Sequence, residues 1–328
     1  MRRFAALVLI SLSSRSAGSP IGECLDASLE RVEMLVSADG EPEVRRPIAV
    51  PRSVNDYMAV RLRKKRRWEL AGAESIVRGL KQHVSLLPAG LGAFVDVGSN
   101  LGTWAINFAH RGDAVIAVEP MARNRHALRA TLCLNPDLRD RIKIVAAALG
   151  SPAEAAGELT CALRAQRVLN VGDGMLDCGP GLSCNSTAHP PAALLAKRQG
   201  RQGALQMSVE QWKSLPCEDV PVHTLAHVVS RGLRELGVAR VGVMKIDVEG
   251  HECAVISGAN FSRPHLRPRV IASEWTNPQS EKCMRAAGER WDYSHQSATG
   301  GMQSKGVDTN ALQVDANYLR KVRTPDAT

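Results

Sequence analysis

Aromatic residues are scarce in this chain of 328 residues, since Phe, Trp and Tyr together make up 4% of it. This scarcity disfavours a surface that binds bases or sugars by stacking. The chain contains no CxxC pair, which excludes a zinc knuckle and a thioredoxin-like redox motif. Its first apolar run, Phe4 to Leu12, is too short to cross a bilayer as a helix, so we expect no stable membrane span.

The remaining composition is that of a folded protein, with 44% hydrophobic and 23% charged residues. The net charge is +9, and much of the excess lies in one basic block at residues 61–67. We interpret this block as a solvated face or linker, with nuclear import or an anionic surface as alternatives. Because no aromatic residues interleave with it, we predict no nucleic-acid binding.

The N-terminus has the order of a targeting segment. Arg2 and Arg3 precede the apolar run, small residues continue to Ser19, and no acid occurs before Glu23. This order is typical of a secretory signal peptide. Richness in Ser and Arg without acids also fits an organelle transit peptide, and an unprocessed cytoplasmic chain is a third alternative. We assign residues 1–22 to targeting and favour the secretory pathway.

The eight cysteines divide into two groups. Four fall in a segment rich in Gly, Pro and Ser: Cys161, Cys178, Cys184 and Cys217. In an oxidising compartment these four could staple that segment. Cys133 and Cys253 fall in predicted core elements, and we interpret them as buried thiols. Glycosylation sequons begin at Asn185 and Asn260, which agrees with the secretory interpretation.

Strand and helix patterns alternate from Ala93 onward. Apolar strands are predicted over 93–97, 114–118, 142–149, 241–248 and 269–273, and helices over 101–109, 121–134, 222–236 and 253–259. Such alternation predicts βαβ units and a mainly parallel sheet with helices on both faces, an α/β fold. Upstream, we predict helices near 29–36 and over 74–87.

These patterns divide the chain into four parts. Residues 23–73 form an N-terminal extension that contains the basic block, 74–280 form the α/β domain, and 281–328 form a tail in which the last strands of the sheet could lie. The α/β domain carries a long insertion between its third and fourth strands, at 151–221, with turns expected at 172–174 and 179–181. We interpret the insertion as either a substrate lid or a decoration.

The loop after the first strand is typical of a nucleoside pocket. Gly98 allows a tight turn and the close approach of a ligand, and Gly102 lets the next helix pack near the strand. The spacing is GxxxG rather than the GxGxxG that makes room for a pyrophosphate. A ligand without phosphate therefore fits better, with Asp96 attracting an ammonium group and Asn100, Leu101 and Gly102 offering backbone contacts.

Glu119, at the end of the second strand, is the expected partner of a ribose. An acid at that position can accept hydrogen bonds from both ribose hydroxyls. At the end of the third strand, Ala148 and Leu149 would lie near an adenine. No acid stands there, so the adenine would be bound by backbone groups.

A second set of polar residues follows the fourth strand. Charges at the mouth of a buried strand are costly unless they are solvated or used. If the strand stays extended, Asp247, Glu249 and His251 point to one side. Glu274, at the end of the fifth strand, brings another acid to the same edge of the sheet. We take these four residues as the candidate catalytic residues.

Neighbouring charges have structural interpretations. Lys245 is expected to form an ion pair with one of the acids, and Glu252 to interact with the dipole of the next helix. Asp247, Glu249 and His251 could instead hold a metal through two carboxylates and an imidazole. We assign no metal site, because open clusters at helix starts are usually not ligands.

The run Lys245–Glu252, KIDVEGHE, resembles the signature of the FkbM family of S-adenosylmethionine-dependent methyltransferases, in which a strand ends in KIDVEGxE. Residues 94–275 share the resemblance, including Ile256–Ala259. The resemblance implies the class I methyltransferase fold, which is a Rossmann-like sheet. It also implies S-adenosylmethionine as cofactor and a sugar or other small molecule as acceptor. One departure is Ala226, where family members commonly have Asp after Leu.

The resemblance implies O-methylation by in-line displacement, in which the protein holds the acceptor oxygen, the methyl group and the sulfur in line. Glu249 or Asp247 is the expected proton acceptor, with His251 as substitute, and Glu274 is expected to bind acceptor hydroxyls. Two other classes stay open. One is a non-catalytic binding module with the same fold. The other is a nicotinamide-dependent oxidoreductase, which the missing GxGxxG disfavours.

Overall fold

The structure is a computed structural model that describes residues 21–37, 42–53, 56–68, 92–157, 159–167, 170–185, 214–274, 278–297 and 309–314. Residues 1–20 of the predicted targeting segment 1–22, the helix expected over 74–87 and most of the first sequon lie outside these ranges.

A seven-stranded sheet forms the centre of the described chain, in the order β13-β14-β12-β11-β3-β4-β5. Its strands are β3 (Ala93–Val97), β4 (Val115–Val118), β5 (Ile142–Val145), β11 (Val241–Ile246), β12 (Val270–Glu274), β13 (Tyr293–Ser297) and β14 (Thr309–Val314). The five central strands are parallel, and β14 runs antiparallel to both of its neighbours. This order and direction confirm the class I Rossmann-like fold, and the C-terminal tail does complete the sheet.

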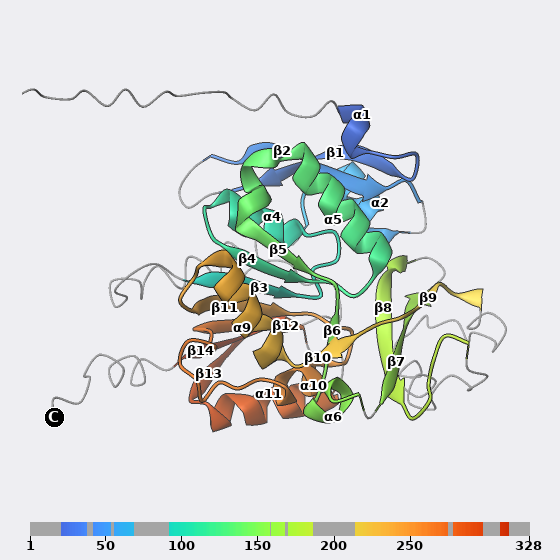
Figure 1. The fold of residues 1–328 in the computed structure, drawn as a ribbon. Helices are drawn as coiled ribbons and strands as arrows, with labels where there is room; N and C mark the ends of the chain where they lie inside the picture. The colour runs from blue at the N-terminus through green and yellow to red at the C-terminus, as the bar shows by residue number, and fades with distance from the viewer. Residues whose placement is uncertain are drawn as a thin grey trace, which may run out of the picture.

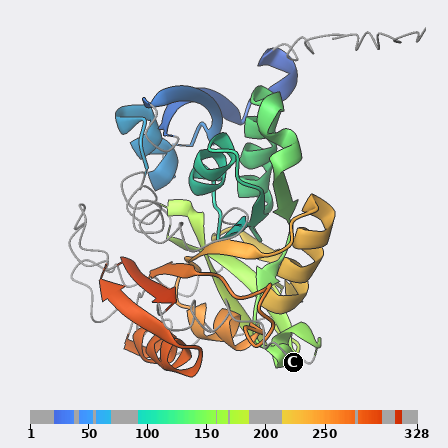
Figure 2. The ribbon, with the colours of Figure 1, turned by 90° about the vertical axis from the view of Figure 1, so that its left-hand side faces the viewer.

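Helices cover both faces of the sheet because its strands are apolar on both sides. Phe94 packs into the core beneath α4 (Thr103–His110) and α5 (Ala122–Leu134), whereas its neighbour Val95 packs into the opposite core. That second core lies under α9 (Leu225–Leu236), α10 (Glu252–Ser257) and α11 (Pro278–Arg290), as Figures 1 and 2 show. The predicted alternation from Ala93 onward is therefore confirmed.

Two predicted elements have other bounds in the structure than the sequence pattern indicated. The strand expected over 142–149 divides into β5 and the short β6 (Ala148–Leu149). The helix expected from Val222 begins at Leu225, because β10 (Val222–His223) pairs in parallel with β6. Thr224 then caps α9, its side chain accepting a hydrogen bond from the backbone N–H of His227 at 3.3 Å.

The helix predicted near 29–36 is wrong, since Leu29–Val36 is the strand β1. It pairs antiparallel with β2 (Val44–Pro51), a long-range contact that overrides the local pattern. This hairpin packs on α5, where the Ala49 N–H donates to the Thr131 hydroxyl at 2.9 Å. The basic block occupies the last turn of the following helix, α2 (Tyr57–Lys65), and the residues just after it.

All eight cysteines form disulfides: Cys24–Cys133, Cys161–Cys178, Cys184–Cys217 and Cys253–Cys283. The expectation that four of them staple the insertion is confirmed. The interpretation of Cys133 and Cys253 as free buried thiols is wrong. The Cys133 partner belongs to α1 (Ile21–Cys24), 109 residues away, and ties the N-terminal extension to α5.

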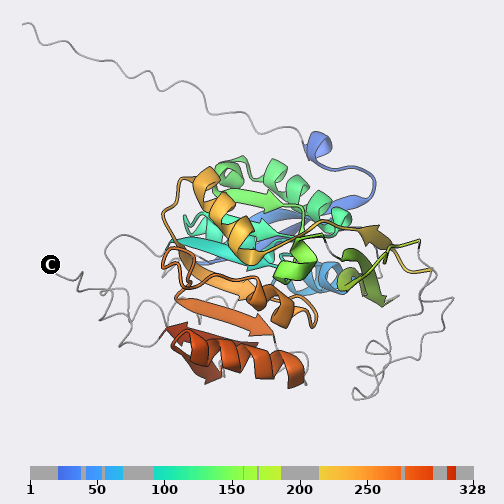
Figure 3. The same cartoon turned by 60° about the horizontal axis from the view of Figure 1, so that its bottom comes forward.

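The described part of the insertion is mostly a small antiparallel sheet. It contains α6 (Pro152–Ala155), β7 (Thr160–Arg167), β8 (Asn170–Gly179) and β9 (Cys217–Asp219), with the strands in the order β8-β7-β9. This sheet stands beside the carboxyl ends of the central strands (Figure 3). The turn expected at 179–181 is present, but the one expected at 172–174 is wrong, because those residues lie inside β8. A residue larger than glycine does not fit at position 172 of β8, because its Cβ would lie 2.6 Å from the Asp56 carboxylate.

Among the described helices, none is both long enough and apolar enough to span a membrane.

The Cys24–Cys133 bond gives a testable expectation. A disulfide that closes a long loop removes more entropy from the unfolded chain, so the variant C24S/C133S should lose about 3–4 kcal/mol of unfolding free energy. The matched variant C161S/C178S opens a loop of only 17 residues and should lose about 1.5 kcal/mol less. Urea unfolding without reductant measures both. Equal losses would contradict the loop-length argument.

Candidate active site

The carboxyl ends of β3, β4, β11 and β12 open into one cavity, as expected for an open parallel sheet. Its empty volume is about 1040 Å³, a value that includes open solvent at its mouth. The residues predicted for the nucleoside pocket and for the reaction site thus meet in a single space.

Two walls of this cavity come from outside the predicted site. Tyr57, Met58 and Trp68 of the N-terminal extension line it, and so do residues 172–174 and Leu176 of β8. Sequence analysis missed them because their position depends on contacts with residues far away in the chain. The insertion therefore forms part of the cavity wall, which favours the lid over the decoration.

The loop after β3 is pressed against the loop after β11. Gly98 has φ +76°, and a Cβ there would lie 1.9 Å from the Asp247 carbonyl oxygen. Its N–H donates to the Val118 carbonyl at 3.0 Å, which holds the loop over β4. Only glycine allows both the left-handed backbone and this approach. Asn100, which follows with φ +50°, lines the cavity as well.

The other loop residues stand behind the cavity wall. Leu101 is buried, and Gly102 makes room for α5, since a Cβ there would lie 2.4 Å from Leu128. Asp96 is completely buried within β3. None of these three residues lines the cavity. The geometry therefore gives no support to the predicted direct contact between them and a ligand.

Glu119 lines the cavity at the end of β4. Its carboxylate accepts hydrogen bonds from the N–H groups of Asn100 at 2.7 Å and Met121 at 2.9 Å, and from the Asn124 amide at 3.3 Å. Burial raises the pKa of Glu119 to about 7, although these hydrogen bonds oppose the shift. Each carboxylate oxygen has two lone pairs, so the side chain can still accept from a ligand hydroxyl. Ala148 and Leu149 lie on the same cavity.

Lys245 connects the two halves of the site. Its ammonium lies 3.0 Å from an Asp247 oxygen and 3.8 Å from an Asp96 oxygen, and it donates to the Gly98 carbonyl at 3.3 Å. The expected ion pair is confirmed. Burial raises the pKa of Asp96 to about 6 against the pull of Lys245. For Asp247 burial is again the largest single effect and raises the pKa, but Lys245 and a hydrogen bond with Glu274 together outweigh it, so the net pKa is lowered.

Three carboxylates gather at the mouth of β11 and β12. Asp247, Glu249 and Glu274 each place an oxygen within 4.8 Å of the other two. Glu249 holds φ +55°, an uncommon conformation for a residue with a long side chain. Such strain is often found where a side chain is aimed at a ligand. The cluster can accept several hydroxyl hydrogen bonds at once.

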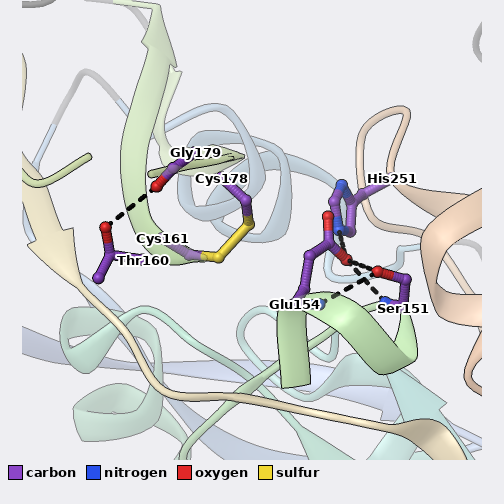
Figure 4. The surroundings of a disulfide bond; sticks show 7 residues. All are labelled: Ser151, Glu154, Thr160, Cys161, Cys178, Gly179 and His251. Atoms are coloured by element: carbon purple, nitrogen blue, oxygen red, sulfur yellow. Dashed lines mark hydrogen bonds and ion pairs between the residues drawn. A yellow bond between two sulfur atoms is a disulfide. The ribbon is translucent and has the colours of Figure 1, made fainter. Parts of the chain in front are cut away.

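His251 turns away from this cluster. The strand β11 ends at Ile246, and Glu249 and Gly250 form a left-handed turn, so the expectation that three side chains share one side is wrong for His251. Its Nε2 lies 3.4 Å from a carboxylate oxygen of Glu154 (Figure 4). His251 still lines the cavity, whereas sequence analysis gave no signal for Glu154.

Glu252 has a structural position, as expected. It is completely buried at the start of α10, where it accepts hydrogen bonds from the Gly250 N–H at 2.9 Å and the Ser280 hydroxyl at 2.5 Å. Its carboxylate thereby fixes the turn that follows β11.

Comparison with protein families gives one match. The family model described as "Methyltransferase FkbM domain" matches residues 96–299, more than half of the 328 residues. The chain matches none of the curated proteins compared with it.

Solved structures to which the chain shows a limited similarity include methyltransferases at low sequence identity. A METTL16 MTase domain shares 10% identity with a TM-score of 0.38, over 73% of this chain and 66% of that one. Precorrin-6y C5,15-methyltransferase from Geobacter metallireducens GS-15 shares 10% with a TM-score of 0.34, over 73% and 88%. The bifunctional kinase-methyltransferase WbdD shares 11% with a TM-score of 0.39, over 76% of this chain and only 40% of its own.

The contact between Gly98 and Asp247 can be tested by substitution. In G98A the new methyl group would strike a backbone carbonyl, so we expect the unfolding free energy to fall by more than about 3 kcal/mol. Gly157 is the matched control, since it has φ +79° with nothing within 4 Å, and G157A should lose only about 1–2 kcal/mol. Thermal and urea unfolding measure both variants, and equal losses would mean that the contact does not matter.

Proposed function

Because the chain belongs to the FkbM family of methyltransferases, we propose that it transfers the methyl group of S-adenosylmethionine to a hydroxyl of a sugar or another small molecule. The observation that carries this proposal is the single cavity between β3, β4, β11 and β12. One side of it has the features of a nucleoside pocket, and the other presents a cluster of hydrogen-bond acceptors.

The nucleoside side fits S-adenosylmethionine. The Gly98 turn lets a ligand approach the backbone closely, and the Glu119 carboxylate can accept hydrogen bonds from ribose hydroxyls. Ala148 and Leu149 offer an apolar surface for an adenine. The loop has the GxxxG spacing rather than GxGxxG, which favours a phosphate-free cofactor over a nicotinamide dinucleotide.

The acceptor side would orient a hydroxyl group. When bound, S-adenosylmethionine supplies a methyl group on a positively charged sulfur. The carboxylates of Asp247, Glu249 and Glu274 can accept hydrogen bonds from an acceptor that carries several hydroxyls, which holds its reacting oxygen in place. The walls from α2 and β8 help to exclude water from the reaction.

A non-catalytic binding module is the second candidate function. Ala226, at the family's usual Leu-Asp pair, is the observation that favours it. Its position in α9 weighs against a loss of function, since its N–H donates to the Gly258 carbonyl at 3.1 Å and the cavity lining does not include it.

Calorimetric titration with S-adenosylmethionine, S-adenosylhomocysteine and NAD tests the cofactor. We expect micromolar binding of both sulfur compounds, no binding of NAD, and a loss of at least about tenfold in affinity in Glu119→Ala. A folded protein that binds none of the three would favour the binding module. Incubation with methyl-labelled S-adenosylmethionine and a panel of sugars and small hydroxylated molecules then tests turnover and identifies the acceptor.

Binding should also depend on the charge of Glu119. The ionised carboxylate accepts ribose hydrogen bonds better, and its pKa is raised to about 7. Affinity for S-adenosylhomocysteine should therefore fall as the pH drops through 7, to about one tenth at pH 6 of its value at pH 8. Glu119→Gln cannot ionise, so its weaker binding should not change over this range. A wild-type affinity that is constant between pH 6 and 8 would contradict this role.

We propose further that the chain enters the secretory pathway. Support comes from the pairing of all eight cysteines and from the order of residues 1–22, because disulfides persist in oxidising compartments. Expression of the complete chain in cultured cells tests this proposal. A secreted product without residues 1–22, whose mass shows four disulfides, is expected. A reduced product in the cytosol would contradict it.

A further inference from the structure

A histidine at the variable position of the family signature and a carboxylate outside that signature form a pair beside the cavity. Glu154 belongs to α6, at the start of the insertion, and His251 lies between β11 and α10. The His251 Nε2 and a Glu154 oxygen are 3.4 Å apart, and the two side chains are only 18% and 12% exposed (Figure 4). The insertion and the α/β domain thus meet at these two residues.

The position of Glu154 is fixed by its own helix. The same carboxylate oxygen that faces His251 accepts the Ser151 N–H at 2.6 Å and the Ser151 hydroxyl at 2.9 Å. The Ser151 hydroxyl in turn accepts the Glu154 N–H at 3.3 Å, which completes a capping box. The neighbouring His251, helped by Ser151 and opposed by burial, lowers the pKa of Glu154 to about 2, with the His251 Nε2 at ion-pair distance and outside hydrogen-bond geometry. The carboxylate is therefore ionised at any working pH.

The insertion also contacts His251 from a second strand. The Cys178 sulfur lies within 4.8 Å of the imidazole nitrogen and of the Glu154 oxygen. Cys178 forms a disulfide with Cys161, so it is not available as a thiolate, and the bond fixes β8 to β7 beside the ring. Asp177 also interacts with the charge of His251, and burial raises the pKa of that carboxyl. The ring is thus enclosed by α6 and β8, with Glu249 two residues earlier in the chain.

Of the groups on the acceptor side, His251 is better suited than Asp247 to take a proton. Lys245 lies 3.0 Å from Asp247 and favours its ionised form, which makes this carboxylate a weak base. His251 instead faces the Glu154 carboxylate and no ammonium group. With Nε2 directed at Glu154, the second ring nitrogen, Nδ1, points away from Glu154 (Figure 4).

We infer that Glu154 is a positioning residue that keeps the proton of His251 on Nε2, so that Nδ1 can accept the proton of the acceptor hydroxyl during methyl transfer. This inference rests on the proposed function. The hydroxyl oxygen forms the new bond to the methyl carbon, the bond between that carbon and the sulfur breaks with its electrons on the sulfur, and the hydroxyl proton passes to Nδ1. Glu154 stabilises the resulting imidazolium, which then releases its proton to solvent.

Nuclear magnetic resonance of the ring nitrogens tests the positioning without turnover. The protein is labelled with ¹⁵N in its nine histidines, and the signals of His251 are assigned by their loss in His251→Gln. At a pH where the ring is neutral, we expect an exchange-protected proton on Nε2 and none on Nδ1. This protected proton should disappear in Glu154→Ala.

Asp177→Asn is the matched control, because it removes a nearby negative charge from β8 and leaves the Glu154 contact in place. It should retain the protected Nε2 proton. A wild-type His251 with its proton on Nδ1 would overturn the inference, and this result does not depend on whether Glu154→Ala folds. An unchanged Nε2 signal in a folded Glu154→Ala would overturn it as well.

Kinetics with an acceptor from the methylation panel then test the catalytic role of His251. We expect kcat to fall about 100-fold in His251→Ala and about tenfold in Glu154→Ala, with the affinity for S-adenosylhomocysteine unchanged in both. The double variant should be no slower than His251→Ala alone, because Glu154 acts through His251. Additive losses would overturn the inference, whereas loss of cofactor binding in the wild type would overturn the proposed function and leave the ring-nitrogen result standing.

Discussion

The arrangement of the site depends on one close contact between backbones. Gly98 lies against the Asp247 carbonyl because it has no side chain, and Lys245 joins the same two loops by its bonds to the Gly98 carbonyl and the Asp247 carboxylate. The loops after β3 and β11 therefore cannot separate without breaking both interactions. This contact joins the predicted nucleoside pocket and the carboxylate cluster into one cavity, and it sets the distance between the two ligands that the cavity is proposed to hold.

The two acids of the site at β3 and β4 differ in what they face. Asp96 lies behind the wall and faces the Lys245 ammonium, so it balances a buried charge and has no exposed surface for a ligand. Glu119 is nearly as buried, yet it faces the cavity and is held by two backbone N–H groups. The two acids thus have different roles: Asp96 supports the loop, and Glu119 is available to a ligand.

Sequence analysis predicted the central sheet and its order of elements because apolar strands such as Ala93–Val97 carry a strong local pattern. It failed where long-range contacts decide. Leu29–Val36 pairs as a strand with Val44–Pro51, and residues 172–174 lie within β8 because that strand pairs with β7 on both sides of a register shift. Glu154 belongs to a capping-box pattern with Ser151, which marks the start of a helix, but only the folded insertion brings it to His251. The pairing of Cys133 with Cys24 likewise depends on how the N-terminal extension packs on α5.

The region that defines the family begins at residue 96, yet part of the cavity wall is built from residues that precede it. Tyr57, Met58 and Trp68 come from an extension that a disulfide anchors to α5. A fragment that begins at residue 96 would keep the signature, but it would lose most of β3 and the wall that α2 provides. One wall of the cavity therefore depends on a part of the chain that the family model does not include, and that part is held to the family's sheet through a covalent bond to α5.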